Sequence, residues 1–187
     1  VHWSDDRGKQ WRKVSGTLPV RPASWWCSRV ELSHFDPQTA YVTFTGYRED
    51  DFRPFVFVTT DGGKTWKSIS SNLPQGPVNV IAEDPRDERV LYVGTEFGVF
   101  VSVDMGKNWR AFDQGIPRVA VHDLVVHPRD RDLVVGTHAR GIFILDDITP
   151  LQEFAALESN PTAHLFSLRE AVAYRSTATQ SISGNRK

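Results

Sequence analysis

One pattern of four residues occurs three times in this chain of 187 residues. Each copy has a serine or threonine, an aspartate two positions later, a glycine two positions further on, and a tryptophan three positions after the glycine. The copies are Ser4, Asp6, Gly8, Trp11; Thr59, Asp61, Gly63, Trp66; and Ser102, Asp104, Gly106, Trp109. Three copies in register indicate a structural repeat, which constrains the fold more strongly than composition does.

The repeat has a regular step in its later part. Asp61 and Asp104 are 43 residues apart, whereas Asp6 and Asp61 are 55 apart, so one unit carries an insertion. Other landmarks keep the step of 43 residues: Trp66 and Trp109, Pro85 and Pro128, Gly98 and Gly141. A period in the low forties with several short strands per unit is typical of propeller blades. The sequence therefore predicts an all-β fold, a partial β-propeller of about three to four four-stranded blades.

Apolar alternation predicts four strands in each unit. In the most regular unit these are residues 78–82, 90–94, 99–103 and 109–112, and the repeated pattern lies on the hairpin between the third and fourth. Gly106 suits a turn position with positive φ, and Asp104 can accept hydrogen bonds from turn amides. Trp109 can bury its ring between neighbouring sheets. The pattern is therefore interpreted as a folding device.

The spacing divides the chain into five segments. Residues 1–19 are a partial blade, 20–75 a blade with the insertion, 76–117 a regular blade, and 118–155 a blade whose fourth copy of the pattern is degenerate, with Thr149 and Gln152 at the glycine and tryptophan positions. Residues 156–187 form a tail, in which Ala163 to Phe166 could supply one edge strand. Because Val1 already lies within repeat sequence, we expect a piece of a longer protein.

The repeated pattern is the Asp-box motif. Two longer runs of sequence also resemble a known family. Residues 93–102 (VGTEFGVFVS) and 135–150 (VGTHARGIFILDDITP) resemble bacterial BNR/Asp-box propeller proteins related to the sortilin (VPS10-type) propeller. The chain is similar to the C-terminal blades of such proteins, up to about Arg175. They are often labelled glycosyl hydrolases, but the motifs do not specify an activity. The resemblance favours an extracytoplasmic location, secreted or periplasmic.

The charge of the chain excludes some classes of partner. It carries 22 basic and 23 acidic side chains, intermixed, for a formal net charge of −1. Such a balance gives neither the basic footprint of a nucleic-acid-binding protein nor a polybasic face for a membrane. No apolar run approaches the ~20 residues of a membrane helix. No motif indicates a cofactor.

A polar funnel is predicted near the centre of the propeller. Three prolines, Pro37, Pro85 and Pro128, align the units. That alignment places three polar residues at one position near the start of the innermost strand: Glu31, Asn79 and His122. Arg29 and Asp123 lie near them in the sequence. A wet channel lined for solubility is the alternative interpretation.

The loops between the second and third strands reach the same end of the propeller. They bring aromatic and charged residues: Tyr47, Arg48, Glu49, Asp50, Asp51, Arg53, Glu96, Phe97, His138 and Arg140. Rings beside carboxylates and arginines could hold a sugar or a peptide carboxylate. Trp25 and Trp26 could add a stacking platform, although core packing explains at least one of them equally well.

Three functions follow. A module that binds a glycan or a peptide leads, because it fits every feature without catalytic geometry. A glycoside hydrolase needs two carboxylates, ~5 Å apart for retention or ~6.5–9.5 Å for inversion. Five candidates exist but no motif selects a pair, so catalytic residues stay unassigned: Glu31, Asp50, Asp51, Glu96 and Asp123. In the third function the free edge at residues 1–19 completes a ring with another copy or with the rest of a larger propeller.

Two other groups are assigned structural roles. His127 occupies a turn position held by Asp36 and Asp84 in the other units, so no zinc site is predicted with His122 and His138. Cys27 follows Trp26 and is expected to be a small buried group, since no base is tied to it by a motif.

Overall fold

The computed structural model describes residues 1–19, 25–113, 115–157, 163–168 and 170, which form four antiparallel sheets and one short α-helix. The two middle sheets have four strands each, and every strand pairs with the next along the chain. The second sheet comprises β3 (Trp26–Leu32), β4 (Ala40–Gly46), β5 (Asp51–Thr59) and β6 (Lys67–Ser68). The third comprises β7 (Val78–Glu83), β8 (Leu91–Thr95), β9 (Gly98–Ser102) and β10 (Arg110–Phe112). Both have the order expected of a propeller blade.

The two outer sheets are smaller. The first sheet is a hairpin of β1 (His2–Trp3) and β2 (Arg12–Lys13), followed by the short turn η1 (Ser15–Thr17). The fourth has three strands, β11 (Val121–Val126), β12 (Leu133–Thr137) and β13 (Ile142–Leu145). The helix α1 (Thr149–Ala156), with proline in its first turn, follows β13. Within the described residues the prediction of a fourth strand in this last unit is therefore wrong, because Pro150 favours the start of a helix.

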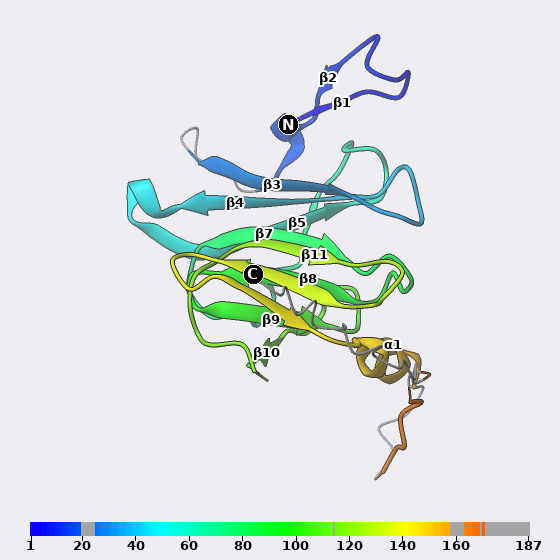
Figure 1. Cartoon of the computed structure of the whole chain (residues 1–187). Helices are drawn as coiled ribbons and strands as arrows, with labels where there is room; N and C mark the ends of the chain where they lie inside the picture. Colours follow the sequence, from blue (N-terminus) through cyan, green and yellow to red (C-terminus); the bar gives the residue numbers. More distant parts are fainter. Residues whose placement is uncertain (20–24, 114, 158–162, 169, 171–187) are drawn as a thin grey trace, which may run out of the picture.

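Neighbouring sheets pack face to face through three apolar cores. The first core, between the first and second sheets, is centred on Trp3, Val14, Val42, Phe44, Phe57 and Trp66. The second core includes Tyr41, Val56, Ile69, Ile81, Leu91 and Trp109. The third core includes Val80, Ala82, Tyr92, Leu124, Val126 and Leu133. Figure 1 shows the resulting stack, with the β1–β2 hairpin and α1 at opposite ends. The stack is a partial β-propeller, as the repeat predicted.

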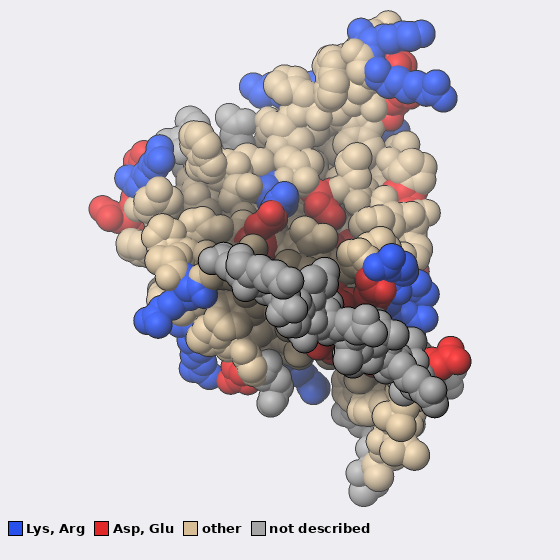
Figure 2. Space-filling view, in the orientation of Figure 1, with Lys and Arg blue, Asp and Glu red and all other residues tan. Residues whose placement is uncertain are grey.

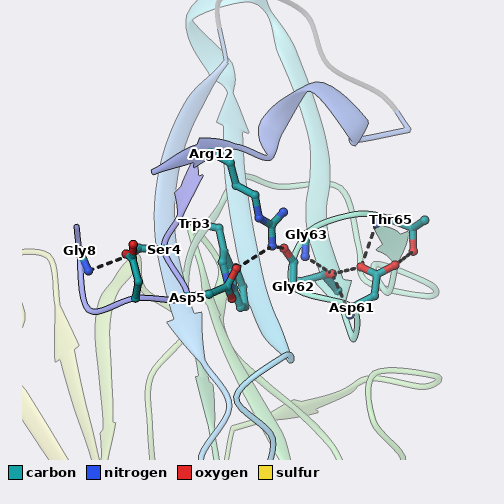
Figure 3. Close-up of polar contacts among 11 residues, drawn as sticks. Trp3, Ser4, Asp5, Gly8, Arg12, Asp61, Gly62, Gly63 and Thr65 are labelled. Carbon is teal, nitrogen blue, oxygen red and sulfur yellow. Dashed lines mark hydrogen bonds and ion pairs between the residues drawn. The ribbon is translucent and has the colours of Figure 1, made fainter. Parts of the chain in front are cut away.

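The three Asp-boxes fold in the same way. In each copy the serine or threonine hydroxyl donates to the aspartate at 2.8 Å and accepts the glycine N–H at 2.7–2.8 Å. The aspartate also accepts the N–H of the residue four positions later, at 2.8–2.9 Å. Figure 3 shows Ser4 with Gly8, and Asp61 with Thr65. These bonds satisfy the amides of a tight turn, which is why the spacing repeats.

Each later Asp-box also docks on the sheet before it. The Nε1–H of Trp66 donates to the carbonyl of Val14 at 3.1 Å, and that of Trp109 donates to the carbonyl of Ile69 at 2.7 Å. Val14 and Ile69 each lie three residues after the tryptophan of the preceding box. Trp11 has no such surface among the described residues and is 63% exposed. Its Nε1–H bonds to Gly8 in its own turn.

Two expectations about local structure are wrong. Ala163 to Phe166 form no strand; His164 instead stacks edge-on against Phe166, and Leu165 is exposed. The rest of the predicted loose end, residues 171–187, lies outside the described residues. The proline alignment fails in the second sheet, because Ser33 takes the turn position of Asp84: its Oγ accepts the N–H groups two and three residues on, as the Asp84 carboxylate does.

Candidate functional site

The two ends of the sheets carry different kinds of connection. One end, here called the loop end, carries the connections β4–β5, β8–β9 and β12–β13 and the starts of β3, β7 and β11. It lies on the left in Figure 1. The opposite end, the box end, carries the Asp-box turns. The scaffold and the variable loops are thus separated, which is common in propellers and sandwiches.

Three β-bulges open the innermost strands at the loop end. The register between the first and second strands shifts at the same point in each of the last three sheets: around Ser28 in β3, Asn79 in β7 and His122 in β11. These three residues are therefore structural equivalents. The predicted equivalence of Glu31 with Asn79 and His122 is wrong, since Pro37 lies three residues too far along its turn to align with Pro85.

The bulge residues line a cavity of about 630 Å³ at the loop end. Its other walls are aromatic and polar side chains: Trp26, Thr45, Tyr47, Arg48, Phe52, Pro77, Glu96 and Phe97. The cavity lies within the size range of small-ligand sites. A β-bulge re-aims a side chain and is over-represented beside binding sites, so the bulges give the cavity its polar floor.

The rim of the cavity is aromatic. The rings of Trp26, Tyr47, Phe52 and Phe97 are each about half exposed or more. The guanidinium of Arg48 lies over two of them, 5.4 Å from the centroid of Trp26 and 5.8 Å from that of Tyr47. Cation–π contacts of this kind fix the orientation of both partners. Trp25, by contrast, is buried, with its ring centroid 3.7 Å from that of Phe55.

Hydrogen bonds hold the floor in place. The Asn79 amide donates to the carboxylate of Glu96 at 2.9 Å and to the carbonyl of Val121 at 3.1 Å. The ring of His122 stacks on that of His138, with centroids 5.4 Å apart. The side chains of Asn79, Glu96 and His122 are therefore each oriented by a neighbour in the floor of the cavity.

Other predicted site residues lie away from the cavity lining. Arg29 pairs with Asp123, joining the innermost strands of the second and fourth sheets. Glu31 is half-buried on β3, and Arg140 is exposed beyond the cavity lining. Asp50 has a left-handed backbone at the end of the short turn η2 (Tyr47–Glu49). The structure therefore brings together only part of the predicted set: Tyr47, Arg48, Asn79, Glu96 and His122.

The candidate carboxylates have different surroundings. Hydrogen bonds from Arg53 lower the pKa of Asp51. Burial raises the pKa of Glu31, and the nearby charge of Arg29 offsets part of that increase. Among the described residues that line the cavity, Glu96 is the one carboxylate. A pair of carboxylates flanking a bound sugar is therefore not assembled within this cavity.

Four residues that line the cavity were not predicted from the sequence: Ser28, Thr45, Phe52 and Pro77. Ser28 was hidden by the failed proline alignment. Phe52 follows the inserted loop. No alternation of apolar and polar residues marks a half-exposed ring at that position, so the sequence did not indicate it. An alignment on the Asp-box, which pairs Thr59 with Ser102, would have placed Asp36 at the position of Asn79, because the insertion lies between Ser28 and Thr59. The equivalence of Ser28 and Asn79 follows from the strand register.

The described part of the chain has no candidate metal cluster and no helix that could span a membrane. No cluster there of three or more His, Cys, Asp or Glu side chains could hold a metal ion. His127 is a turn residue, since its Nδ1 accepts the N–H of Asp130 at 3.1 Å. The one α-helix among the described residues, α1, is too short to span a bilayer. Figure 2 shows acidic and basic side chains interspersed on one face, without a single-sign patch.

The fold and the Asp-boxes define this chain as a segment of an Asp-box β-propeller. Residues 54–154, more than half of the chain, match the Sortilin-Vps10 family, described as sortilin, neurotensin receptor 3. The chain belongs to this family. No curated protein sequence matches it.

Solved structures with the same fold include glycoside hydrolases. The GH74 enzyme of Niastella koreensis is 16% identical over 65% of this chain and 21% of its own length, with a TM-score of 0.53. An ancestral GH74 enzyme is 15% identical over 61% of this chain and 14% of its own, with a TM-score of 0.50. YCF48 bound to a D1 peptide is 23% identical over 70% and 39%, with a TM-score of 0.47. At these identities the likeness to the two GH74 enzymes shows the fold alone, and the chain spans about a fifth or less of each of them.

Proposed function

We propose that the cavity at the loop end binds a glycan, with a sugar ring stacked on the aromatic rim and its hydroxyls bonded to the polar floor. The observation that carries this proposal is the combination of four part-exposed rings with three bulges that turn polar side chains toward one cavity. A pyranose has the same two-sided character, since its C–H groups are apolar and its hydroxyls are donors and acceptors.

The rim supplies the apolar contact. Trp26 and Phe97 come from different sheets, β3 and the β8–β9 loop, so a ring placed between them contacts two blades. Large rigid rings provide contact area at a low cost in conformational entropy. The guanidinium of Arg48 lies over the Trp26 ring, and both side chains line the cavity.

The floor supplies direction. The Asn79 amide nitrogen donates a hydrogen bond to one carboxylate oxygen of Glu96. The amide oxygen of Asn79 and the second carboxylate oxygen of Glu96 take no part in this bond, and both are hydrogen-bond acceptors. Ser28 and Thr45 add hydroxyl groups; Ser28 also contacts Thr43 and Val78. A few placed polar groups within a mostly apolar pocket are typical of a site that selects the orientation of its ligand.

Binding is favoured over hydrolysis by the carboxylate positions. A two-carboxylate mechanism needs an acid and a second carboxylate on opposite sides of the scissile bond. Glu96 could serve as one of them, but Asp51 is paired with Arg53 and Asp123 with Arg29. Neither lines the cavity. Binding of a sugar without cleavage accounts for each feature of the site described above.

The test is a titration of the full chain with neutral oligosaccharides, for example cellohexaose, xylohexaose and laminarihexaose, followed by calorimetry. Trp26→Ala is expected to weaken binding at least tenfold, which is about 1.4 kcal/mol. Trp11→Ala is the matched control, because Trp11 and Trp26 are both 63% exposed but only Trp26 lines the cavity.

Three results would overturn the assignment. Equal loss of binding in the Trp11 and Trp26 variants would place the sugar elsewhere. Binding of a peptide library, with no sugar bound at millimolar concentration, would make the cavity a peptide site. Release of reducing ends during the titration would restore the hydrolase alternative.

A further inference from the structure

A second cavity, of about 430 Å³, adjoins the candidate glycan site. It lies beside β9, β10 and the connection from β10 to β11. Phe97 lines both this cavity, here called the second cavity, and the loop-end cavity described above. The two cavities therefore meet at one aromatic ring. The other walls of the second cavity are mostly apolar and include Pro74, Val99, Ala111, Phe112, Ile116 and Pro117.

The border between the two cavities is built from backbone as well as from the Phe97 ring. Pro74 lines the second cavity and Pro77 lines the loop-end cavity, so residues 74–77 pass between them. Gly76 packs against the Phe97 ring, since a Cβ added to Gly76 would lie 2.8 Å from Cδ2 of Phe97. The N–H of Gly76 donates to the carbonyl of Phe52 at 2.8 Å. The Gly76 backbone therefore joins two residues of the aromatic rim.

The turn that carries Phe97 is held by a buried hydroxyl. The N–H of Phe97 donates to Oγ1 of Thr95 at 3.0 Å, and that hydroxyl donates to the carbonyl of Gly98 at 3.1 Å. Thr95 is buried, whereas Phe97 is 58% exposed. Because the backbone around Phe97 is fixed while its ring stays accessible, the ring can contact a ligand that extends from one cavity into the other.

The two cavities differ in chemistry. The floor of the loop-end cavity offers hydroxyl, amide and carboxylate groups, from Ser28, Asn79 and Glu96. Among the described residues that line the second cavity, no side chain carries a hydroxyl or an amide. Its two charged residues, Asp113 and Arg118, pair with each other at 3.4 Å, and both side chains are more than half exposed. Sugar hydroxyls would lose their water in the second cavity without gaining partners, whereas an apolar group is stabilised there.

We propose that the site takes a glycoside with an apolar aglycone, of the aryl or alkyl class. The sugar lies in the loop-end cavity, and the aglycone passes the Phe97 ring into the second cavity. This inference rests on the proposed glycan site and adds the class of ligand that the site selects. A ligand with one polar and one apolar part matches the change of lining at Phe97, and a longer chain of sugars does not.

The test compares free disaccharides with their p-nitrophenyl β-glycosides, by calorimetry on the full chain. The disaccharides are cellobiose, xylobiose and laminaribiose. For a disaccharide that binds, the p-nitrophenyl group is expected to tighten binding by about tenfold or more, because the ring is removed from water. The heat-capacity change on binding is expected to become more negative, which is the marker of apolar burial. The matching tetrasaccharide is expected to show no such gain.

One pair of variants locates the aglycone. Ala111 is exposed and lines the second cavity but not the loop-end cavity. Ala111→Asp is expected to remove the gain from the p-nitrophenyl group and to leave the affinity for the free disaccharide unchanged. Ala156→Asp is the matched control, because Ala156 is an exposed alanine on α1 that lines neither cavity. It is expected to leave both affinities unchanged.

The outcomes separate this inference from the glycan site itself. A disaccharide that binds equally well with and without the p-nitrophenyl group overturns the inference and leaves the glycan site standing. A gain that Ala111→Asp preserves, or that Ala156→Asp reduces equally, also overturns it. An equal gain from the tetrasaccharide would make the second cavity a further sugar subsite instead. If no sugar binds in any form, the glycan assignment fails and this inference fails with it.

Discussion

The glycine of each Asp-box gives the sharpest test of how the sheets are joined. Gly106 has a φ of +78°, and a Cβ added there would lie 2.9 Å from Cδ1 and 3.0 Å from Cβ of Ile69 in the sheet before it. Gly8 has almost the same φ, +83°, but its added Cβ would meet only the Trp11 ring at 3.5 Å, an ordinary contact. The pair therefore separates backbone strain from the crowding between sheets.

The magnitudes follow from these two contributions. Alanine in a left-handed conformation costs roughly 1–2 kcal/mol. Crowding a well-packed core adds typically 1–3 kcal/mol. Gly8→Ala is thus expected to lower the free energy of unfolding by about 1–2 kcal/mol at most, and Gly106→Ala by about 2–5 kcal/mol. The difference corresponds to about 2–12 °C in Tm for a chain of this size.

Urea unfolding followed by far-ultraviolet circular dichroism measures both variants on one scale. Gly63→Ala serves as a second crowded site, since its added Cβ would lie 2.7 Å from Cβ of Val14. The reasoning is refuted if Gly106→Ala and Gly63→Ala are no more destabilised than Gly8→Ala. That result would mean that the Asp-box turns do not pack closely against the neighbouring sheet in solution.

Two further predictions concern buried and capping carboxylates. Tyr41→Phe removes a 2.8 Å hydrogen bond to the buried carboxylate of Glu83 and is expected to cost about 1–3 kcal/mol of unfolding free energy in urea titrations. Tyr92→Phe, at the equivalent position with a 3.5 Å contact, is expected to cost less; a reversed order would contradict the geometry. Hydrogen bonds from Thr65, backbone first, lower the pKa of Asp61 to about 2. Its contribution to stability is therefore full above about pH 4 and disappears as the pH falls through 2, and a carboxyl pKa of 3.8 by nuclear magnetic resonance would disprove the cap.

The fold was predictable because the Asp-box is a local device. Its serine, aspartate and glycine act within one turn, so three copies reveal three hairpins without knowledge of their neighbours. The repeat period then predicted how many strands lie between successive Asp-boxes. The last sheet departs from it because Thr149 and Pro150 replace the turn residues with the start of a helix. That signal, proline in the first turn, was present in the sequence.

The candidate site was predictable only in part. Proline marks a turn but not a fixed place within it, so Pro37 shifted the alignment and selected Glu31 instead of Ser28. Bulges add one residue to a strand without a sequence signature, and the polar floor depends on three of them. The aromatic rim also depends on how the insertion folds, which brings Tyr47 and Phe52 to the same cavity.

The docking of the boxes has a direction along the chain. Trp66 binds a carbonyl at Val14, and Trp109 binds one at Ile69, so each hairpin rests on an element nearer the N-terminus. During synthesis the earlier element leaves the ribosome first. Trp66 and Trp109 can therefore each dock on an element that has already emerged when their own hairpin is made.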